Sequence, residues 1–400
     1  MMDWTALRAQ FHLPDGVIYL DGNSLGPLPK AVSARVRAVI EDEWGDLLIR
    51  GWNSGAGGQG WMTWPTRLGD RIGRLIGAGP GTVTTGDTLS IKVYQALASA
   101  LHLAGDRRVI LSDTGNFPTD LYMAEGLIST IGQGHSLRTV APEGVEAALS
   151  EDVAVLMLTQ VDYRTGRMHD MAALTRAAQA KGIVTIWDLA HSAGAHEVDL
   201  TAAGADFAVG CTYKYLNAGP GAPAFIYVRK DLQDAVRPAL SGWLGHAAPF
   251  AFDPAYAPGE GIERMRVGTP PVLQLAALEA ALDVWDGIDM AAVRARSLAL
   301  SDRFAAGVAD ACPDLTPALA PDVPRGSQIS LRHPDGYAIV QALIARGVIG
   351  DFRAPDILRF GFTPLFLSEA EVDAAVGILA DVMDSGAYRR PEYATRNAVT

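Results

Sequence analysis

Short apolar runs alternate with helical segments through much of the chain, and this alternation constrains the fold more than any other feature of the sequence. Residues 108–112, 153–158 and 183–187 have the composition of buried strands, and residues 168–180 have a helical pattern. Strands that alternate with helices form a mostly parallel sheet covered by helices, and ligands bind at the carboxyl ends of its strands. The sequence therefore predicts an α/β fold with a site at that edge.

Chemically capable side chains fall at the predicted strand ends and helix starts. They are Ser90, Phe117, Asp120, Thr159, Asp188 and Lys214. Asp188 directly follows the apolar run 183–187, where a carboxylate can keep a pyridinium nitrogen protonated. Lys214 stands among aromatic and apolar neighbours, and a partly desolvated amine can form an imine with an aldehyde cofactor. Together these two residues suggest pyridoxal phosphate.

Two further stretches fit a phosphate-bearing aromatic ligand. Residues 87–101 open with capping residues and continue as a helix, so the free amides near Leu89 and the Ser90 hydroxyl could bind phosphate. In the loop 116–120, Phe117 could stack on a planar ring while neighbouring polar groups bond its substituents. An ordinary helix start and an ordinary turn explain the same residues equally well.

The stretch 51–64 is rich in glycine and tryptophan. Its adaptable backbone and flat apolar side chains could line the pocket of an aromatic ligand. Packing against a neighbouring subunit would use the same residues. The sequence leaves both interpretations open.

Composition and charge exclude several classes of function. A net charge of −12 argues against binding to nucleic acid or to an anionic membrane surface. The two cysteines, Cys211 and Cys312, have neither disulfide-framework nor metal-site spacing, so we expect no metal and a reducing cytoplasmic location. No basic segment followed by an apolar one opens the sequence, and we expect no signal peptide.

Length and pattern predict one large and one smaller domain. We expect residues 49–286 to form the large cofactor-binding domain and residues 287–400 a small α+β domain, because helices and short strands alternate differently after Gly287. Residues 1–48 are predicted to be an N-terminal segment that packs with the small domain.

With these pieces in place, the sequence resembles the kynureninases, which are fold type I pyridoxal phosphate enzymes of the aminotransferase superfamily. The resemblance runs through nearly the whole chain. The stretches that carry it are 19–26 (YLDGNSLG), 116–120 (NFPTD), 187–194 (WDLAHSAG), 212–217 (TYKYLN), 241–243 (SGW), 268–271 (GTPP) and 358–360 (LRF). Several motifs in order are far more specific than any one of them.

The resemblance implies roles for residues of this chain. The catalytic residues would be Lys214, which forms the Schiff base, Asp188 at the pyridine nitrogen, and Tyr213 as a proton donor. The remaining implied cofactor contacts are Leu89, Ser90, Phe117, Pro118, Thr119, Asp120, Thr159, His191, Trp243 and Thr269. Arg359 would clamp the substrate α-carboxylate, a bidentate task that lysine performs poorly. Asn23 and Ser24 are the other implied substrate contacts.

By the same resemblance, Trp243 and Thr269 match positions that reach the cofactor or substrate across a dimer interface, so a homodimer with shared active sites is expected. The implied reaction is hydrolysis of L-kynurenine or 3-hydroxy-L-kynurenine to anthranilate or 3-hydroxyanthranilate and L-alanine, in tryptophan degradation or NAD biosynthesis. Thr269 stands where animal members usually carry asparagine, and the loop 52–61 has extra glycines, so the preference between the two substrates stays open.

Other functions use some of the same residues. An aminotransferase would need Asp188, Lys214 and Arg359 equally, and its product from kynurenine would be kynurenic acid. A cysteine desulfurase needs a cysteine on a mobile loop, which neither Cys211 nor Cys312 is expected to provide. A binding or regulatory protein of the same fold would usually have lost the lysine or the acid.

Overall fold

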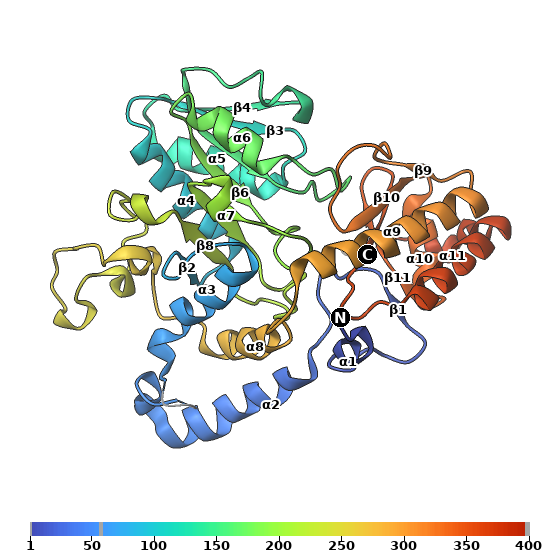
Figure 1. The fold of residues 1–400 in the computed structure, drawn as a ribbon, viewed down its shortest axis with the longest axis horizontal. Coiled ribbons are helices and arrows are strands. Elements are labelled where there is room, and N and C mark those ends of the chain that lie inside the picture. Colours follow the sequence, from blue (N-terminus) through green and yellow to red (C-terminus); the bar gives the residue numbers. More distant parts are fainter. Residues whose placement is uncertain (1, 56–58, 397–400) are drawn as a thin grey trace.

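A seven-stranded sheet forms the centre of the large part of the molecule (Figure 1). The computed structural model describes residues 2–55 and 59–396. The strand order is β2-β8-β7-β6-β5-β3-β4, and β8 runs antiparallel to β2 and β7 whereas the other neighbouring pairs are parallel. The strands are β2 (Val83–Thr85), β3 (Val109–Asp113), β4 (Ser136–Val140), β5 (Val153–Thr159), β6 (Val184–Asp188), β7 (Phe207–Gly210) and β8 (Phe225–Val228).

Helices cover both faces of this sheet (Figure 1). They are α3 (Trp64–Leu75), α4 (Leu89–Leu103), α5 (Pro118–Ile131), α6 (Met171–Gln179), α7 (Leu200–Ala203) and α8 (Val272–Asp283). Successive side chains of a strand point to opposite faces, so Ile110 packs in the apolar cluster of α4 and α5, whereas Leu111 packs in the cluster that contains α3 and α8. Both faces of the strands are therefore apolar, as the continuous apolar runs predict.

The small part of the molecule contains a second, antiparallel sheet with the order β12-β13-β10-β9. Its strands are β9 (Thr316–Pro317), β10 (Gln328–Arg332), β12 (Asp351–Arg353) and β13 (Ile357–Gly361), and its helices are α9 (Met290–Ala311), α10 (Gly336–Ile344) and α11 (Glu369–Asp384). Ser368 and Glu371 form a capping box at the start of α11. Among the helices described, none is long and apolar enough to cross a membrane.

The N-terminal segment contacts both parts. Helix α1 (Trp4–Arg8) is held by an ion pair of 2.6 Å between Arg8 and Glu371, and β1 (Ile18–Tyr19) pairs in parallel with β11 (Val348–Ile349). Helix α2 (Lys30–Ala38) then leaves the small part and packs against α8. The domain boundaries drawn from the sequence stay a prediction.

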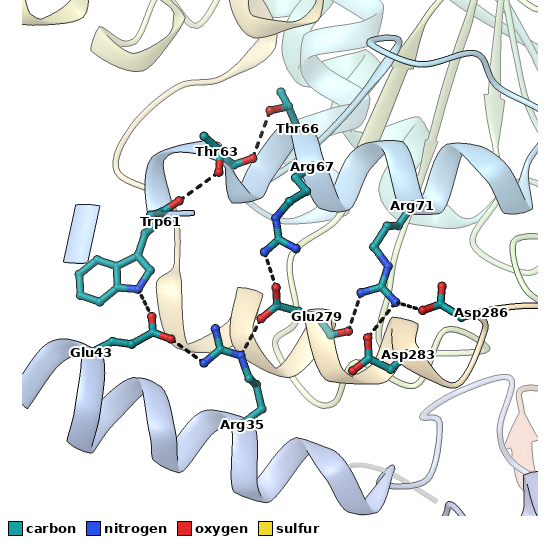
Figure 2. Close-up of polar contacts among 11 residues, drawn as sticks. Arg35, Glu43, Trp61, Thr63, Thr66, Arg67, Arg71, Glu279, Asp283 and Asp286 are labelled. Atoms are coloured by element: carbon teal, nitrogen blue, oxygen red, sulfur yellow. Dashed lines mark hydrogen bonds and ion pairs between the residues drawn. The ribbon is translucent and has the colours of Figure 1, made fainter. Parts of the chain in front are cut away.

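A buried ion-pair network fixes the path of the chain after α2 (Figure 2). Helix α2 changes after Ala38 into the π-helix η1 (Val39–Leu47), which ends where Leu48 adopts a positive φ of 53°. Glu43 of η1 accepts hydrogen bonds from Arg35 at 2.7 Å and from the Trp61 indole at 2.6 Å. Arg35 also binds Glu279 of α8 at 2.6 Å, so the network joins this segment to the large part.

Single turns complete the structure. They are the 3-10 segments η2 (Leu48–Trp52), η4 (Trp61–Thr63), η5 (Pro142–Gly144), η6 (Lys230–Leu232), η7 (Trp243–Gly245), η8 (Pro249–Ala251), η9 (Gly261–Met265), η10 (Ala387–Arg389) and η11 (Pro391–Tyr393). Of the loop 51–64 singled out in the sequence, residues 56–58 lie outside the described residues. Trp52 and Trp61 pack edge to face with ring centroids 5.4 Å apart, and Trp61 and Trp64 are buried.

Candidate active site

A cavity of about 200 Å³ lies where side chains of the two parts of the molecule converge. Its walls come from both sheets and from the N-terminal segment. The lining residues are Asp21, Ser24, Phe117, Tyr163, His191, Tyr213, Lys214, Asp351, Arg353 and Arg359. Predicted site residues therefore meet at one place, although they come from positions 24 to 359 of the chain.

Lys214 projects from the loop that follows β7. The Thr212 hydroxyl donates to Pro223 O at 2.6 Å, which closes this loop before the chain enters β8. The Lys214 Nζ lies 3.1 Å from His191 Nε2, and it also lies 5.9 Å from the ring centroid of Phe117. Burial, together with the positive charge of Lys214, lowers the pKa of His191 well below its usual range. His191 is therefore neutral and can accept a hydrogen bond from the amine.

Asp188 ends β6 inside the protein, with Thr159 of β5 opposite it in register. Its Oδ1 accepts a hydrogen bond of 2.7 Å from Ala190 N. Burial raises the pKa of Asp188, and the charge of Lys214 and the Ala190 amide oppose part of that rise. Asp120 is buried beside it, and burial and then the charge of Asp188 raise the Asp120 pKa well above its usual range. The pKa of each carboxyl group of this buried pair is therefore raised, and the rise is larger for Asp120.

A hydrogen bond to its backbone carbonyl holds Tyr213 at the cavity. Gly26 N of the N-terminal segment donates to Tyr213 O at 2.8 Å. A Cβ on Gly26 would lie 2.3 Å from Lys214 O, so this close approach requires glycine. Burial is the main cause that raises the pKa of the Tyr213 hydroxyl above its usual value. The phenol therefore remains protonated at neutral pH and can act as a donor.

Arg359 provides a guanidinium that lines the cavity from the small part of the molecule. It is 1% exposed and lies on the central strand β13 of the small sheet. Its Nε donates to Asp351 at 2.8 Å, its Nη1 to Tyr163 O at 2.6 Å, and its Nη2 to Ser24 Oγ at 2.6 Å. These contacts fix the plane of the guanidinium before any ligand binds.

Leu89 and Ser90 lie in the first turn of α4, which starts four residues after β2 ends. Because β2 runs in the same direction as β7, this helix start lies at the sheet edge from which Lys214 and Asp188 project. Neither residue lines the cavity. The first amides of α4 are free of a side-chain cap within the described part of the chain.

Several predicted residues lie away from the cavity walls. Pro118 and Thr119 begin α5, next to Phe117. Asn23 is fully buried and packs against Gly361 of β13. Trp243, which is 42% exposed, packs on Phe250, and Thr269 is exposed on a nearby segment. Figure 1 shows this yellow region on the side of the sheet away from the small part. Within one chain, Trp243 and Thr269 are not brought to the cavity.

Four cavity residues were not identified from the sequence: Asp21, Tyr163, Asp351 and Arg353. Tyr163 follows Asp162 in a loop, and its ring packs edge to face on Phe117 with centroids 5.0 Å apart. Asp351 and Arg353 alternate on β12, beside the strand of Arg359. The Asp-x-Arg alternation spans only this three-residue strand, which is too short to have revealed either residue from the sequence.

The residues present fit pyridoxal phosphate. Asp188 ends β6 and Lys214 follows β7, the strand that pairs with β6, and the charge of Lys214 acts on the pKa of Asp188. His191 Nδ1 and Ser192 Oγ are buried polar atoms for which the described residues supply no hydrogen-bond partner. Such atoms are costly unless a ligand or water satisfies them. Phe117, 40% exposed at the cavity, presents an aromatic face to a planar ring.

Comparison with known proteins identifies the family. The model of the kynureninase C-terminal domain matches residues 293–379. The kynureninase of Pseudomonas fluorescens is 51% identical over 402 residues, which cover 98% of this chain and 96% of that protein. The kynureninase of Burkholderia pseudomallei strain K96243 is 52% identical over 404 residues, with the same coverage of both chains. The chain belongs to the kynureninase family. The predicted kynureninase resemblance is thereby confirmed.

Solved structures show how widely the fold of this kynureninase family member is shared. The C-DES protein with glycine linked covalently to its PLP cofactor superposes with a TM-score of 0.81 at 20% identity, covering 94% of this chain and 99% of that one. The cysteine desulfurase CsdA from Escherichia coli gives a TM-score of 0.80 at 19% identity, covering 96% and 99%. The predicted fold type I class is confirmed. Both Cys211 and Cys312 are buried, whereas a cysteine desulfurase needs a cysteine on a mobile loop.

Proposed function

We propose that this chain hydrolyses L-kynurenine, or its 3-hydroxy form, to anthranilate or 3-hydroxyanthranilate and L-alanine, with pyridoxal 5'-phosphate as cofactor. The observation that carries the proposal is 51% identity to a kynureninase over 98% of the chain, together with a cavity that both Lys214 and Arg359 line. The pathway served would be tryptophan degradation or NAD biosynthesis, and a cytoplasmic location is the corresponding expectation.

Residues of the large part would hold the cofactor. Lys214 would attach it through its aldehyde, Asp188 would hold a proton at its ring nitrogen, and Phe117 would stack on one face. The remaining proposed contacts are Leu89, Ser90, Pro118, Thr119, Asp120, Thr159, His191 and Tyr213. When bound, pyridoxal phosphate supplies an electron sink for negative charge at the substrate α-carbon. The Lys214 charge and the Ala190 amide favour the charged form of Asp188, which supports its role.

Proton transfer in the reaction would be divided between two side chains. The Lys214 amine, once exchanged for the substrate amine, would take the proton from the substrate α-carbon. Neutral His191, 3.1 Å from Nζ, can accept a hydrogen bond from this amine and so orient it. The Tyr213 hydroxyl, whose pKa burial raises, would donate in the later steps in which water attacks the γ-carbonyl. Arg359 would bind the substrate α-carboxylate, next to Ser24 and Asn23.

We propose a homodimer with shared active sites. Exposed aromatic side chains gather near Trp243, where Phe250 is 62% and Phe252 79% exposed. Such a patch marks an interaction surface, and a second copy would allow Trp243 and Thr269 to complete a cavity from which they are distant in one chain. Light scattering on the purified protein tests this part: a monomer with full activity would contradict it.

The activity test measures the products formed from kynurenine by the holoenzyme. Fluorescent anthranilate with an equal amount of L-alanine supports hydrolysis. Kynurenic acid instead of anthranilate would show that the chain is an aminotransferase. Lys214→Ala serves as the control, because it should abolish both products.

A further inference from the structure

Three charged side chains of the small sheet lie on one face because of strand register. Strands β12 and β13 are antiparallel, and Asp351 lies directly opposite Arg359. Arg353 is two residues after Asp351, so its side chain projects to the same face of β12. All three line the cavity. The register therefore gives the site two guanidiniums and one carboxylate.

Asp351 is shared between the two arginines. Its Oδ1 accepts from Arg359 Nε at 2.8 Å, and its Oδ2 accepts from Arg353 Nη2 at 2.6 Å and also from Arg359 Nη2. Both guanidiniums also donate to Ser24 Oγ, Arg359 at 2.6 Å and Arg353 at 3.1 Å. The side chains of Asp351 and Arg359 are 3% and 1% exposed, whereas that of Arg353 is 34% exposed. Arg353 thus faces the open side of the cluster.

The charge balance of the cluster shows what Arg353 contributes. Asp351 neutralises one guanidinium, so Arg359 and Asp351 alone would form a neutral pair with little attraction for an anion. Arg353 restores one net positive charge. Its Nε is buried, and the described residues provide no acceptor for it. A buried cationic donor without an acceptor is unfavourable unless a ligand supplies one.

We infer that Arg353 is a second cationic residue of the substrate-carboxylate site, which provides the net positive charge that Arg359, paired with Asp351, lacks. This inference rests on the proposed function, because that function places the substrate carboxylate at Arg359. The recognised ligand is the α-carboxylate of an amino acid.

The experiment compares two ligands that differ in the carboxylate alone. L-Alanine carries the carboxylate and L-alaninamide replaces it with a neutral amide. Binding of both to the holoenzyme is measured by titration calorimetry for wild type, Arg353→Met and Arg353→Lys. Arg332→Met on β10 is the matched control, because Arg332 also forms an ion pair with an aspartate, Asp356, at 3.1 Å but does not line the cavity.

Arg353→Met should weaken L-alanine binding about ten-fold or more and change alaninamide binding by less than about two-fold, because the lost attraction acts on the carboxylate. Arg353→Lys keeps the charge and should recover most of the L-alanine affinity. Arg332→Met should change neither. Equal weakening for both ligands, or unchanged L-alanine binding, would overturn the inference and leave Arg353 as a support of Asp351.

Two further outcomes remain interpretable. If Arg353→Met does not fold, Arg353→Lys decides: L-alanine affinity within about three-fold of wild type supports the role of charge, and a loss of about ten-fold or more contradicts it. If wild type binds L-alanine but does not hydrolyse kynurenine, the proposed function fails while the comparison of L-alanine with alaninamide still tests Arg353.

Discussion

The two walls of the cavity differ in how their central polar groups are held. On the wall formed by the large part of the molecule, called the large-domain wall below, His191 Nδ1 and Ser192 Oγ are buried and have no partner among the described residues. On the wall formed by the small part and the N-terminal segment, called the small-domain wall below, the Arg359 guanidinium donates hydrogen bonds to Asp351, Ser24 and the Tyr163 carbonyl before any ligand binds. Arg353 Nε on the small-domain wall is, however, also buried without a partner among the described residues. The first wall has unpaired polar atoms that a bound cofactor can satisfy, and the second holds the Arg359 guanidinium in a fixed orientation for the substrate.

This difference follows from the two kinds of sheet. Parallel strands end together, so Thr159 and Asp188 meet at one edge and leave helix starts and turns free to bind a group there. Antiparallel strands place residues directly opposite each other, so Asp351 and Arg359 form a cross-strand ion pair within the sheet. Substitutions on the large-domain wall should therefore affect the chemical step, and those on the small-domain wall should affect substrate binding.

The largest effect is expected for Lys214→Ala. Loss of the amine removes both the attachment of the cofactor and the base, so kcat for kynurenine hydrolysis should fall on the order of 10³-fold or more. Anthranilate fluorescence measures the rate. Lys181→Ala, far from the cavity, is the control. A variant that keeps a tenth of the wild-type rate would show that the large-domain wall does not carry the chemistry.

Arg359→Lys should act mainly on KM. Lysine keeps the charge but cannot donate to Asp351, Ser24 and Tyr163 O in one plane. KM for kynurenine should therefore rise roughly thirty-fold, which corresponds to a loss of about 2 kcal/mol of binding free energy. The decrease in kcat should be much smaller. Steady-state kinetics separate the two, and a loss confined to kcat would remove the distinction between the walls.

Glu43→Gln tests a region outside both walls. The substitution keeps the size of the side chain but removes the charge that binds Arg35 and the Trp61 indole, so the free energy of unfolding should fall by about 2 kcal/mol. Chemical denaturation measures this change, and KM should remain as in wild type. A large increase in KM at unchanged stability would instead assign the network of Figure 2 to the substrate site.

The smallest effect concerns Asp21, which lies in the charged cluster of the small-domain wall. Burial, and then the charge of Asp351, raise the Asp21 pKa to about 8, while Arg359 opposes the rise. The charged and titratable groups around it are Asp351 and Arg353 from β12, Arg359 from β13, Tyr19 from β1 and Tyr215 from the loop after β7.

Below about pH 8 Asp21 is neutral, and above it a second negative charge appears beside Arg359. KM should then rise roughly five-fold, which corresponds to a loss of about 1 kcal/mol of binding free energy. Asp21→Asn should remove this rise. Stability follows the same direction: the unfolded chain loses this proton near pH 4 and the folded chain near pH 8, so stability decreases as pH rises between them. Identical pH profiles for wild type and Asp21→Asn would contradict both expectations.

The sequence allowed more to be predicted on the large-domain wall than on the small-domain wall. Asp188 and Lys214 each follow an apolar run, and a local pattern of this kind indicates a strand end without knowledge of the fold. Asp351 and Arg353 lie in a three-residue strand, where alternation is too short to reveal a face. Tyr163 accepts a hydrogen bond from Arg359 through its backbone carbonyl. Every residue has such a carbonyl, so the sequence does not indicate which one takes this role.

The sequence by itself determined the parallel sheet, the acid and amine at its edge, and the family, because apolar periodicity and ordered motifs are local properties of the chain. Tertiary structure alone decided that Asp351 neutralises Arg359, that Asp120 and Asp188 are buried together with raised pKa values, and that Trp243 and Thr269 lie away from the cavity of their own chain. The physical reason is that charge pairing, burial and proton location depend on distances between residues far apart in sequence, which strand register and domain packing set.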